Sequence, residues 1–305
     1  MGNSSNNDKF TETTTTFPVT MNSWKLYLQD QGRSDFTIKA FLGDIRLLSR
    51  FLTPDKKIGE INTQDLTHFI EWLNNGRGKG IPCSPKSLAR RITTIKSFFR
   101  WLHKYGQIKV DPAASLAQQS VISPMPLVLT NVELQMVIEG ADKLRKQESP
   151  DARPYALLKL LIETGIKKSE CLNLKHQHII SENHNYHLYV RYKDIKDRNK
   201  ERKIDLTEEW YDAYQEYLAQ YQPYEEIFPW SPRRLEYLLE DIGNSVGLNK
   251  HLSFSMCRWN CALLDWQSGK DPEWIRQKLG ISKIQWREIK NKLALLAENE
   301  KKAKH

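Results

Sequence analysis

Residues 84–105 carry the pattern that most constrains how this chain folds. Ser84-Pro85 begins a segment in which apolar residues recur at helical spacing. Serine suits the N-cap of a helix and proline suits its first turn. The pattern therefore predicts one long helix with a single apolar stripe that faces a core. The stripe consists of Leu88, Ile92, Ile95, Phe99 and Leu102.

The opposite face of this predicted helix is basic. No acidic residue occurs between Lys86 and Lys109, whereas solvated helices normally mix both signs of charge. Basic and hydroxyl side chains at this spacing suit a DNA groove or backbone, and a solvated surface is the alternative interpretation. The polar face holds Lys86, Arg90, Thr93, Ser97, Arg100 and Lys104.

The positive charge of the chain is concentrated in its first half. The formal net charge is +9, and residues 21–120 contain 16 Lys and Arg against 8 Asp and Glu, whereas residues 121–305 contain 29 against 27. A basic half favours a polyphosphate partner, with simple solubility as the alternative. The length of 305 residues and the hydrophobic content of 39% allow two folded domains.

The cysteines and the apolar segments exclude several classes of protein. Cys83, Cys171, Cys257 and Cys261 form no zinc-type CxxC pair, so we expect reduced thiols, no metal, no cofactor and a cytoplasmic protein. No apolar segment is long enough for a membrane span. Residues 1–17 are rich in Asn, Ser and Thr and lack an apolar core, which predicts a disordered arm and not a signal peptide.

The periodicity predicts two domains that are mainly α-helical. Residues 18–118 form an all-helical domain with helices over 21–31, 35–52, 63–74 and 84–105, and residues 119–128 form a linker. In the second domain, residues 129–305, Thr130 and Glu133 form a capping box, and a helix over 155–164 ends at Gly165. Residues 186–206 alternate like a β-hairpin with a charged turn, and the chain is helical again from Glu208.

Several strings in the first half belong together, namely Phe41 before Asp44, Phe98–Leu102, Gly106–Ile108, Asp111–Ala113 and Leu129-Thr130. They include an aromatic end to the long helix, a Gly-x-Ile loop before a proline, and a Leu-Thr entry to the second domain. Taken in order, they resemble the core-binding domain of tyrosine recombinases, the phage integrase family.

The second half resembles the catalytic domain of the same family. Thr164–Glu170 is similar to T-G-L-R-x-S-E, whose arginine grips the scissile phosphate, and Lys167 stands in its place. The turn Lys196–Arg202 is similar to G-K-G-x-K-x-R, whose first lysine protonates the leaving oxygen. That place falls on Asp197, and Lys196 fits it only after a shift of one residue. Ser255–Arg258 aligns with H-x-L-R and retains its arginine.

The resemblance also implies where the catalytic tyrosine should lie. Gly269 and Gly280 are 11 residues apart, as two glycines of the family are, and the tenth residue after Gly280 is Lys290. A lysine amine does not form the phosphotyrosyl link of the family. Ser255 and Ile281 occupy the two histidine positions, and no tyrosine follows Tyr237. We interpret this pattern as DNA binding retained and cleavage lost, so that the chain is not an enzyme.

The function predicted from the sequence is therefore sequence-specific binding of double-stranded DNA by a catalytically inactive recombinase fold. The resemblance suggests a transcriptional repressor of a phage or mobile element that maintains prophage lysogeny. The alternatives are a non-cutting accessory subunit of an active recombinase and a recombinase with a displaced nucleophile. An antagonist, whether a small regulatory protein or a peptide, has no signature in the sequence.

The amphipathic segment 286–302 suggests a homodimer on DNA, because this region docks onto a neighbouring protomer in the family, and packing within the chain is equally compatible with it. Arg90, Lys96 and Arg100 are the expected base-reading residues. The complete predicted DNA-binding set is Lys86, Arg90, Lys96, Arg100, Lys104, Lys167, Lys196, Lys200, Arg202, Arg233, Arg234 and Arg258.

Overall fold

The computed structural model describes residues 17–53, 56–78, 80–118 and 123–303. The chain divides into two compact units, Met1–Pro124 and Met125–His305. The disordered arm predicted over residues 1–17 lies outside the described residues, except for Phe17, which begins the first helix.

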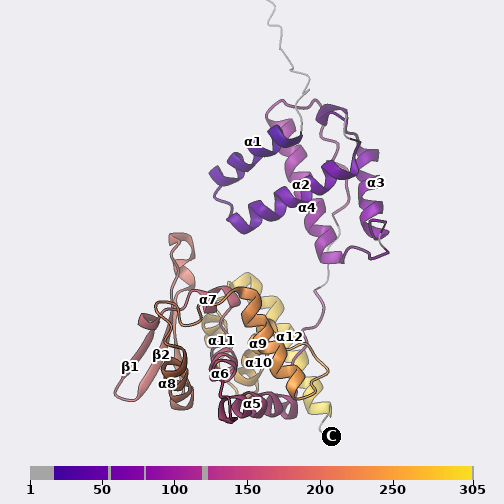
Figure 1. Cartoon of the computed structure of the whole chain (residues 1–305). Helices are drawn as coiled ribbons and strands as arrows, with labels where there is room; N and C mark the ends of the chain where they lie inside the picture. Colours follow the sequence, from indigo (N-terminus) through magenta and orange to yellow (C-terminus); the bar gives the residue numbers. More distant parts are fainter. Residues whose placement is uncertain (1–16, 54–55, 79, 119–122, 304–305) are drawn as a thin grey trace, which may run out of the picture. The chain divides into compact units, whose positions relative to one another are not determined.

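The first unit is a bundle of α-helices (Figure 1). Ser34 and Ser84 cap the second and fourth helices, because each serine hydroxyl accepts a hydrogen bond from the backbone three residues later. Pro85 follows Ser84 in the first turn, so the fourth helix begins where the sequence predicts it. The elements are α1 (Phe17–Asp30), α2 (Asp35–Phe51), the 3₁₀ helix η1 (Ile58–Glu60), α3 (Thr63–Asn74) and α4 (Pro85–Lys104).

The predicted apolar stripe of α4 forms the centre of the first unit. All five of its residues are buried, and Ile95, Phe99 and Leu102 have no exposed surface. Phe98 is also fully buried and lies edge-on to Trp24 of α1, with ring centroids 5.1 Å apart. Burial of such side chains stabilises a fold by about 1.5–3 kcal/mol each. The core therefore turns one face of α4 inward and leaves its basic face at the surface.

The second unit surrounds the buried helix α6 (Arg153–Thr164) with further helices and one sheet (Figure 1). Thr130 and Glu133 form the predicted capping box of α5. Gly165 ends α6 in the left-handed conformation with φ 59°. The helices are α5 (Asn131–Lys146), α6 (Arg153–Thr164), α7 (Lys168–Leu172), η2 (His176–His178), η3 (Ile195–Lys200), α8 (Glu208–Tyr221), α9 (Pro232–Ser245), α10 (Phe254–Gln267), α11 (Pro272–Lys278) and α12 (Lys283–Ala303).

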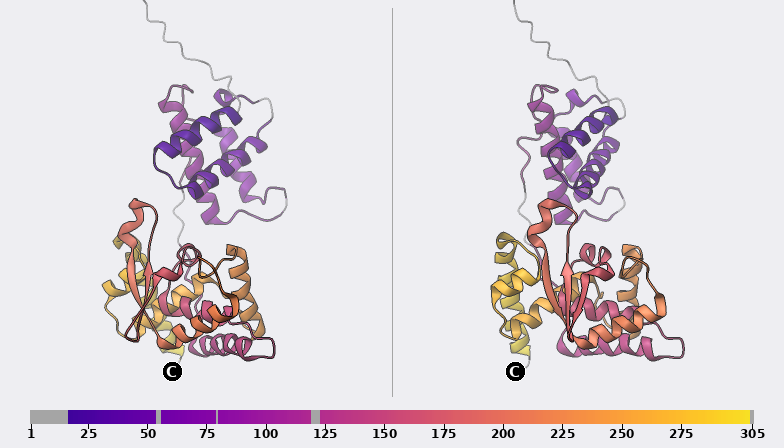
Figure 2. Two further views of the ribbon diagram at one scale, coloured as in Figure 1. Left: turned by 60° about the vertical axis from the view of Figure 1, so that its left-hand side comes forward. Right: turned by 90° about the vertical axis from the view of Figure 1, so that its left-hand side faces the viewer.

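The sheet has three antiparallel strands in the order β1-β2-β3, namely β1 (Ile179–Glu182), β2 (Asn185–Val190) and β3 (Arg202–Leu206). The sequence predicted only the hairpin of β2 and β3. Asn183 and His184 both have positive φ, so they form the tight turn that adds β1. The predicted charged turn is η3, at the free end of the hairpin that extends from the helices (Figures 1 and 2). The predicted fold class, mainly helical with a small sheet, is confirmed.

The last helix packs on its own chain. Trp286 and Leu293 of α12 are buried in a cluster with Ala262 and Leu263 of α10 and Ile275 of α11. Of the two arrangements that the amphipathic segment allows, packing within the chain is the one that these side chains adopt. Among the described residues, no helix is both long and apolar enough to cross a membrane.

Candidate active site

The site begins at the junction between α6 and α7. Gly165 lets the chain turn sharply, and a Cβ atom there would lie 3.0 Å from Leu279 and 3.1 Å from the sulfur of Cys261. Only a glycine fits both this left-handed backbone and the close packing. The turn brings Lys167 and α7 against the loop that follows α11.

Glu170 of α7 is the buried centre of the site. Its carboxylate accepts hydrogen bonds from both terminal nitrogens of Arg202, at 2.9 and 3.1 Å, and from the Tyr192 hydroxyl. The Lys167 backbone N–H donates a further bond at 2.8 Å. Burial raises the pKa of Glu170, but the hydrogen bonds and the charge of Arg202 outweigh it and lower the pKa to about 2. Glu170 is therefore ionised at neutral pH and organises its neighbours.

Arg202, at the start of β3, uses its hydrogen-bond donors within the protein. Its Nε donates to the Lys278 carbonyl at 2.6 Å, and Nη1 also donates to the Lys200 carbonyl at 3.1 Å. The guanidinium lies directly over Gly280, where a Cβ atom would come within 2.5 Å of Nη1. Arg202 thus connects β3 and α7 to the loop after α11.

Arg258 of α10 approaches the same loop from another direction. Its two terminal nitrogens donate to the carbonyls of Gly165 and Leu279, the latter at 2.5 Å. Burial lowers the pKa of this guanidinium. Ser255, one turn earlier on α10, is exposed.

Lys167 is the accessible member of this cationic group. Its ammonium donates to the Gly280 carbonyl at 3.2 Å and lies 3.6 Å from Glu170, and about a third of its side chain (34%) is exposed. Burial lowers the pKa of Lys167, and the charges of Arg258, Arg202 and Lys200 lower it further, against the opposite effect of Glu170. Lys167, Arg202 and Arg258 therefore converge on one site, here called the Gly280 cluster.

The two predicted lysines of η3 differ in their relation to this cluster. Lys200 donates to Asp197 at 2.5 Å, and its charge acts on Lys167. Lys196 lies 3.7 Å from Asp194. The charge of Lys200 thus bears on the Gly280 cluster.

The predicted arginines of α9 lie at its exposed first turn. Arg233 and Arg234 are both exposed, and Arg233 Nε donates to the Tyr237 hydroxyl at 2.6 Å. An ion pair of 2.5 Å between Lys168 and Glu236 joins α7 to α9. Both arginines therefore belong to a helix that contacts the element carrying Glu170.

The predicted residues of α4 divide into two groups. Lys86, Arg100 and Lys104 are exposed. Arg90 donates to Asp44 at 2.5 Å, and the Lys96 ammonium donates to the carbonyls of Leu116, at 2.6 Å, and Ala114, at 3.1 Å. The exposed group is open to a ligand, whereas Arg90 and Lys96 also hold contacts within the unit.

Three residues that organise the contacts described above were not singled out as site residues from the sequence. Glu170 ends the T-G-L-R-x-S-E-like string, and its place there was a signal that it matters. Tyr192 was assigned only to the hairpin. Asp44 was assigned to a helix and to a family-like string with Phe41, but nothing local shows which residues either side chain meets across the fold. Among the described residues, no three His, Cys, Asp or Glu side chains gather as a metal site would require.

The positions inferred for the catalytic groups can now be located. Lys290 is exposed on α12, and Ile281 is buried in the cluster formed with α10 and α11. Tyr192, by contrast, places its hydroxyl on Glu170 within the Gly280 cluster. Burial and Glu170 raise the pKa of Tyr192 well above its usual range, so the phenol keeps its proton.

The fold and the cationic cluster define a protein of the tyrosine recombinase class. Residues 21–106 match the phage integrase N-terminal SAM-like domain, and residues 128–289 match the phage integrase family. The second match alone covers more than half of the chain. The chain belongs to the phage integrase family.

Known relatives carry the same family identity. The chain is 32% identical over 144 residues to tyrosine recombinase XerC of Mycobacterium leprae, which covers 47% of each protein. It is 25% identical over 196 residues to tyrosine recombinase XerD of Listeria monocytogenes, covering 64% of this chain and 62% of that one. The chain thus spans about half the length of the first curated relatives that it matches.

A solved structure shares the fold. The crystal structure of a lambda integrase dimer bound to a COC′ core site matches with a TM-score of 0.68, at 16% identity, over 90% of this chain and 77% of that one. At this identity the likeness concerns the fold alone.

These relatives correct the function predicted from the sequence. The interpretation as a repressor that is not an enzyme is wrong, because the relatives are named tyrosine recombinases, which are enzymes. The error came from counting ten residues beyond Gly280. A nucleophile at that position would have to lie on α12 of this chain. A tyrosine from another element or from another protomer would not be found by this count.

Proposed function

We propose that this chain is a subunit of a site-specific recombination complex that acts on double-stranded DNA. One observation carries the proposal: Lys167, Arg202 and Arg258 converge around Gly280 from separate elements. Positive groups held in advance beside a reacting phosphate stabilise the charge that develops on its oxygens. The names of the XerC and XerD relatives support the same function.

Within this proposal, Lys167 contacts the phosphate and the two arginines hold it in place. Lys167 keeps about a third of its side chain exposed, whereas the side chain of Arg202 is 8% exposed, and both arginines bind backbone carbonyls. Lys200, Lys196, Arg233 and Arg234 extend the positive surface, and Lys86, Arg100 and Lys104 provide phosphate contacts from α4. Arg90 and Lys96 contribute positive charge in addition to their hydrogen bonds within the first unit. A dimer on DNA, such as the lambda integrase dimer forms on its core site, is the expected assembly.

The source of the nucleophile distinguishes two versions of this function. In the first, which we favour, cleavage is completed in the assembled complex by a tyrosine of a neighbouring recombinase protomer, because the Tyr192 hydroxyl of this chain is held by Glu170 and keeps its proton. In the second, the chain cuts DNA with a displaced tyrosine. Tyr192 is the candidate, because its hydroxyl already lies in the Gly280 cluster, and a bound phosphate would have to draw it away from Glu170 before attack.

Covalent trapping on nicked duplex DNA tests both versions. The full chain is incubated with the duplex, alone and with a tyrosine-bearing recombinase from the same genome, and adducts that survive denaturant are measured. We expect binding without an adduct for the chain alone, and adducts or strand exchange in the mixture. Lys167→Gln should reduce the mixed reaction, and Lys168→Gln, one residue away and paired with Glu236, is its matched control.

Two results would redirect or end the proposal. An adduct formed by the chain alone and abolished by Tyr192→Phe would select the second version. Absence of any binding to duplex DNA at physiological salt, where non-specific phosphate contacts are weak, would overturn both versions.

A further inference from the structure

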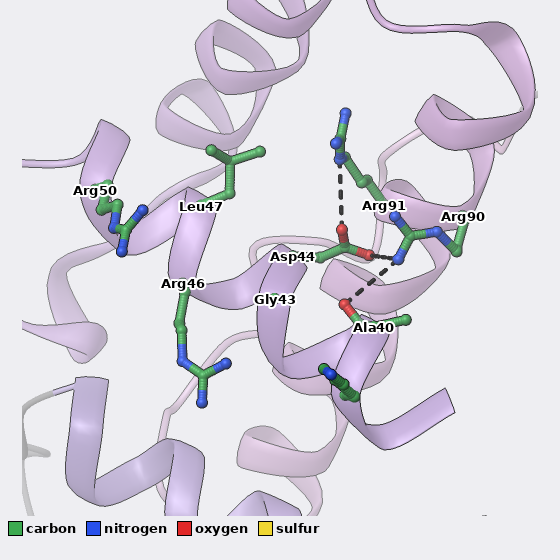
Figure 3. A pocket seen from close by; sticks show the side chains of 9 residues that line it. Ala40, Gly43, Asp44, Arg46, Leu47, Arg50, Arg90 and Arg91 are labelled. Atoms are coloured by element: carbon green, nitrogen blue, oxygen red, sulfur yellow. Dashed lines mark hydrogen bonds and ion pairs between the residues drawn. The ribbon is translucent and has the colours of Figure 1, made fainter. Parts of the chain in front are cut away.

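The first unit contains an open pocket of about 420 Å³ between α2 and α4 (Figure 3). Five of the side chains that line it are cationic and one is anionic. Such an excess of one sign in a concave surface attracts a ligand of opposite charge. The charged lining residues are Lys39, Asp44, Arg46, Arg50, Arg90 and Arg91.

Asp44 fixes the arginines on the α4 side of this pocket. Its side chain is 5% exposed and accepts bonds from Arg90 at 2.5 Å, from Arg91 at 3.4 Å and from the buried Thr94 hydroxyl at 3.0 Å. Figure 3 shows the carboxylate between the two guanidinium groups. Arg90 nevertheless keeps 39% of its side chain exposed. Asp44 therefore orients Arg90 without enclosing it.

The α2 side of the pocket is a basic stripe. Lys39, Arg46 and Arg50 follow one helical face and form no ion pair with any described residue. Gly43 lies on the same face, at i+4 from Lys39, so that the stripe has one position without a side chain. The cations on this face are available to a ligand.

Gly43 has no structural reason to be a glycine. It lies in the interior of α2 with an ordinary helical backbone, and a Cβ atom there would meet nothing within 4 Å. Glycine inside a helix is less favourable than alanine, because its backbone loses more conformational freedom on folding. The space that a glycine leaves at such a place lets a ligand approach the backbone closely.

We propose that this pocket binds a phosphate group of the DNA backbone, which sits against Gly43 and is held by Arg46, Arg50 and the Arg90 that Asp44 positions. The proposal rests on the DNA-binding function proposed above. It gives Arg90 a contact with the DNA backbone and not with a base. Backbone contacts set register and affinity for every sequence alike, so the pocket adds affinity without selecting a site.

Gly43→Ala separates the role of the pocket from the stability of the fold. Alanine should raise the melting temperature, because it favours the helix and clashes with nothing. It should also weaken DNA binding several-fold, and Gly43→Val, which fills more of the pocket, should weaken it further. The full chain is titrated with a plain synthetic duplex at physiological salt, followed by fluorescence anisotropy, beside thermal unfolding of each variant.

Arg46→Gln tests the charge, with Arg33→Gln as its matched control. Arg33 is an exposed arginine between α1 and α2 that does not line the pocket. We expect Arg46→Gln to weaken binding about tenfold, the scale of one charge-assisted contact. It should also reduce the slope of log affinity against log salt by about 0.9, the loss of one phosphate contact. Arg33→Gln should change neither quantity comparably.

The sign of the change in DNA affinity caused by Asp44→Asn tests whether Asp44 positions Arg90. Loss of a negative charge would by itself strengthen binding to DNA, whereas loss of the group that positions Arg90 should weaken it. We expect weaker binding, by the same factor for duplexes of different sequence. Thr94→Val, which changes no charge but loosens Asp44, should weaken binding in the same direction and by less.

The outcomes separate this inference from the function on which it rests. If wild type does not bind duplex DNA, the proposed function fails. If wild type binds, but Gly43→Ala and Arg46→Gln behave like Arg33→Gln, or Asp44→Asn binds more tightly, the pocket is not a backbone site. Titration with inorganic phosphate at constant ionic strength is the last arm. Stabilisation of wild type but not of Arg46→Gln at millimolar phosphate, together with equal binding of duplex DNA by the two proteins, would assign the pocket to a free anion and overturn the assignment to DNA.

Discussion

Asp44 in the first unit and Glu170 in the second are both buried carboxylates that bind arginine, but they leave those arginines in different states. Arg90, held by Asp44, has 39% of its side chain exposed, whereas Arg202, held by Glu170, has 8%. The pKa values differ in the same way. Burial raises the pKa of Asp44 despite its arginines, whereas Arg202 and Tyr192 lower that of Glu170 to about 2 despite burial.

The difference follows from how the donors are arranged. Glu170 receives two bonds from one buried guanidinium, one from a phenol and one from the backbone, and all four favour its ionised form. Arg90 shares its charge with water, so Asp44 gains less from it. The first unit thus directs Arg90 outward to a pocket. The second uses its arginines as an internal frame and presents Lys167.

Replacement of Glu170 should give the largest effect on stability. Glu170→Gln leaves Arg202 buried without a counter-charge, which typically costs about 3–5 kcal/mol. Asp44→Asn should cost clearly less, because Arg90 reaches solvent. Chemical denaturation of each full-length variant, followed by circular dichroism, measures both changes. Equal losses would show that the exposure of the arginine does not decide the cost.

The pH dependence of stability should have opposite signs for the two carboxylates. The folded pKa of Glu170, about 2, lies below its ordinary value of 4.5. Its contribution, on the order of 3 kcal/mol, is therefore present at neutral pH and lost as pH falls from about 5 to 2. The folded pKa of Asp44 is raised, so its protonation at low pH favours the folded state.

Acid titration of unfolding free energy can separate these contributions. The difference between wild type and Glu170→Gln should shrink between about pH 5 and pH 2. For Asp44→Asn the opposite is expected. As the pH falls, the unfolding free energy of the wild type should rise relative to that of this variant. If the unfolding free energies of the two variants changed with pH in parallel, the predicted difference between Glu170 and Asp44 would be wrong.

The sequence predicted best what depends on neighbouring residues. The apolar stripe of α4, its Ser84 cap and the capping box of Thr130 are local patterns, and the structure contains all three. The strand β1 was missed because it is only four residues long and its turn, Asn183-His184, contains no glycine. The start of α1 at Phe17 was missed because a run of threonines hides the beginning of its periodicity.

The site was predictable only where a string resembled the family. Lys167 and Arg258 came from such strings, but the contact of Arg202 with Lys278 spans 76 residues, and no local pattern reveals it. Asp44 meets Arg90 in the same way, across 46 residues. The functional interpretation failed for a related reason, since it treated the residue at one counted position as decisive for a cluster that is assembled in space.

Replacement of Gly280, which lies under Arg202, should give the next largest effect on stability. Gly280→Ala imposes the left-handed strain of a non-glycine residue, about 1 kcal/mol, and also displaces a guanidinium that would lie 2.5 Å from the new Cβ. Gly269→Ala is the matched control, because Gly269 also has positive φ but has nothing within 4 Å of its Cβ position. We expect Gly280→Ala to lose at least about 1 kcal/mol more, the cost of a disturbed charged hydrogen bond. Equal losses would mean that Arg202 moves aside freely.

The smallest effect should come from the exposed ion pair next to Glu170. Lys168 and Glu236 are 2.5 Å apart, yet their side chains remain 39% and 44% exposed. Water and salt screen such a pair, so Glu236→Gln should cost between about 0 and 1 kcal/mol, and less still at high salt. Denaturation at low and high ionic strength measures both. A loss as large as that of Glu170→Gln would mean that the contact between α7 and α9, and not the burial of the carboxylate, holds the site together.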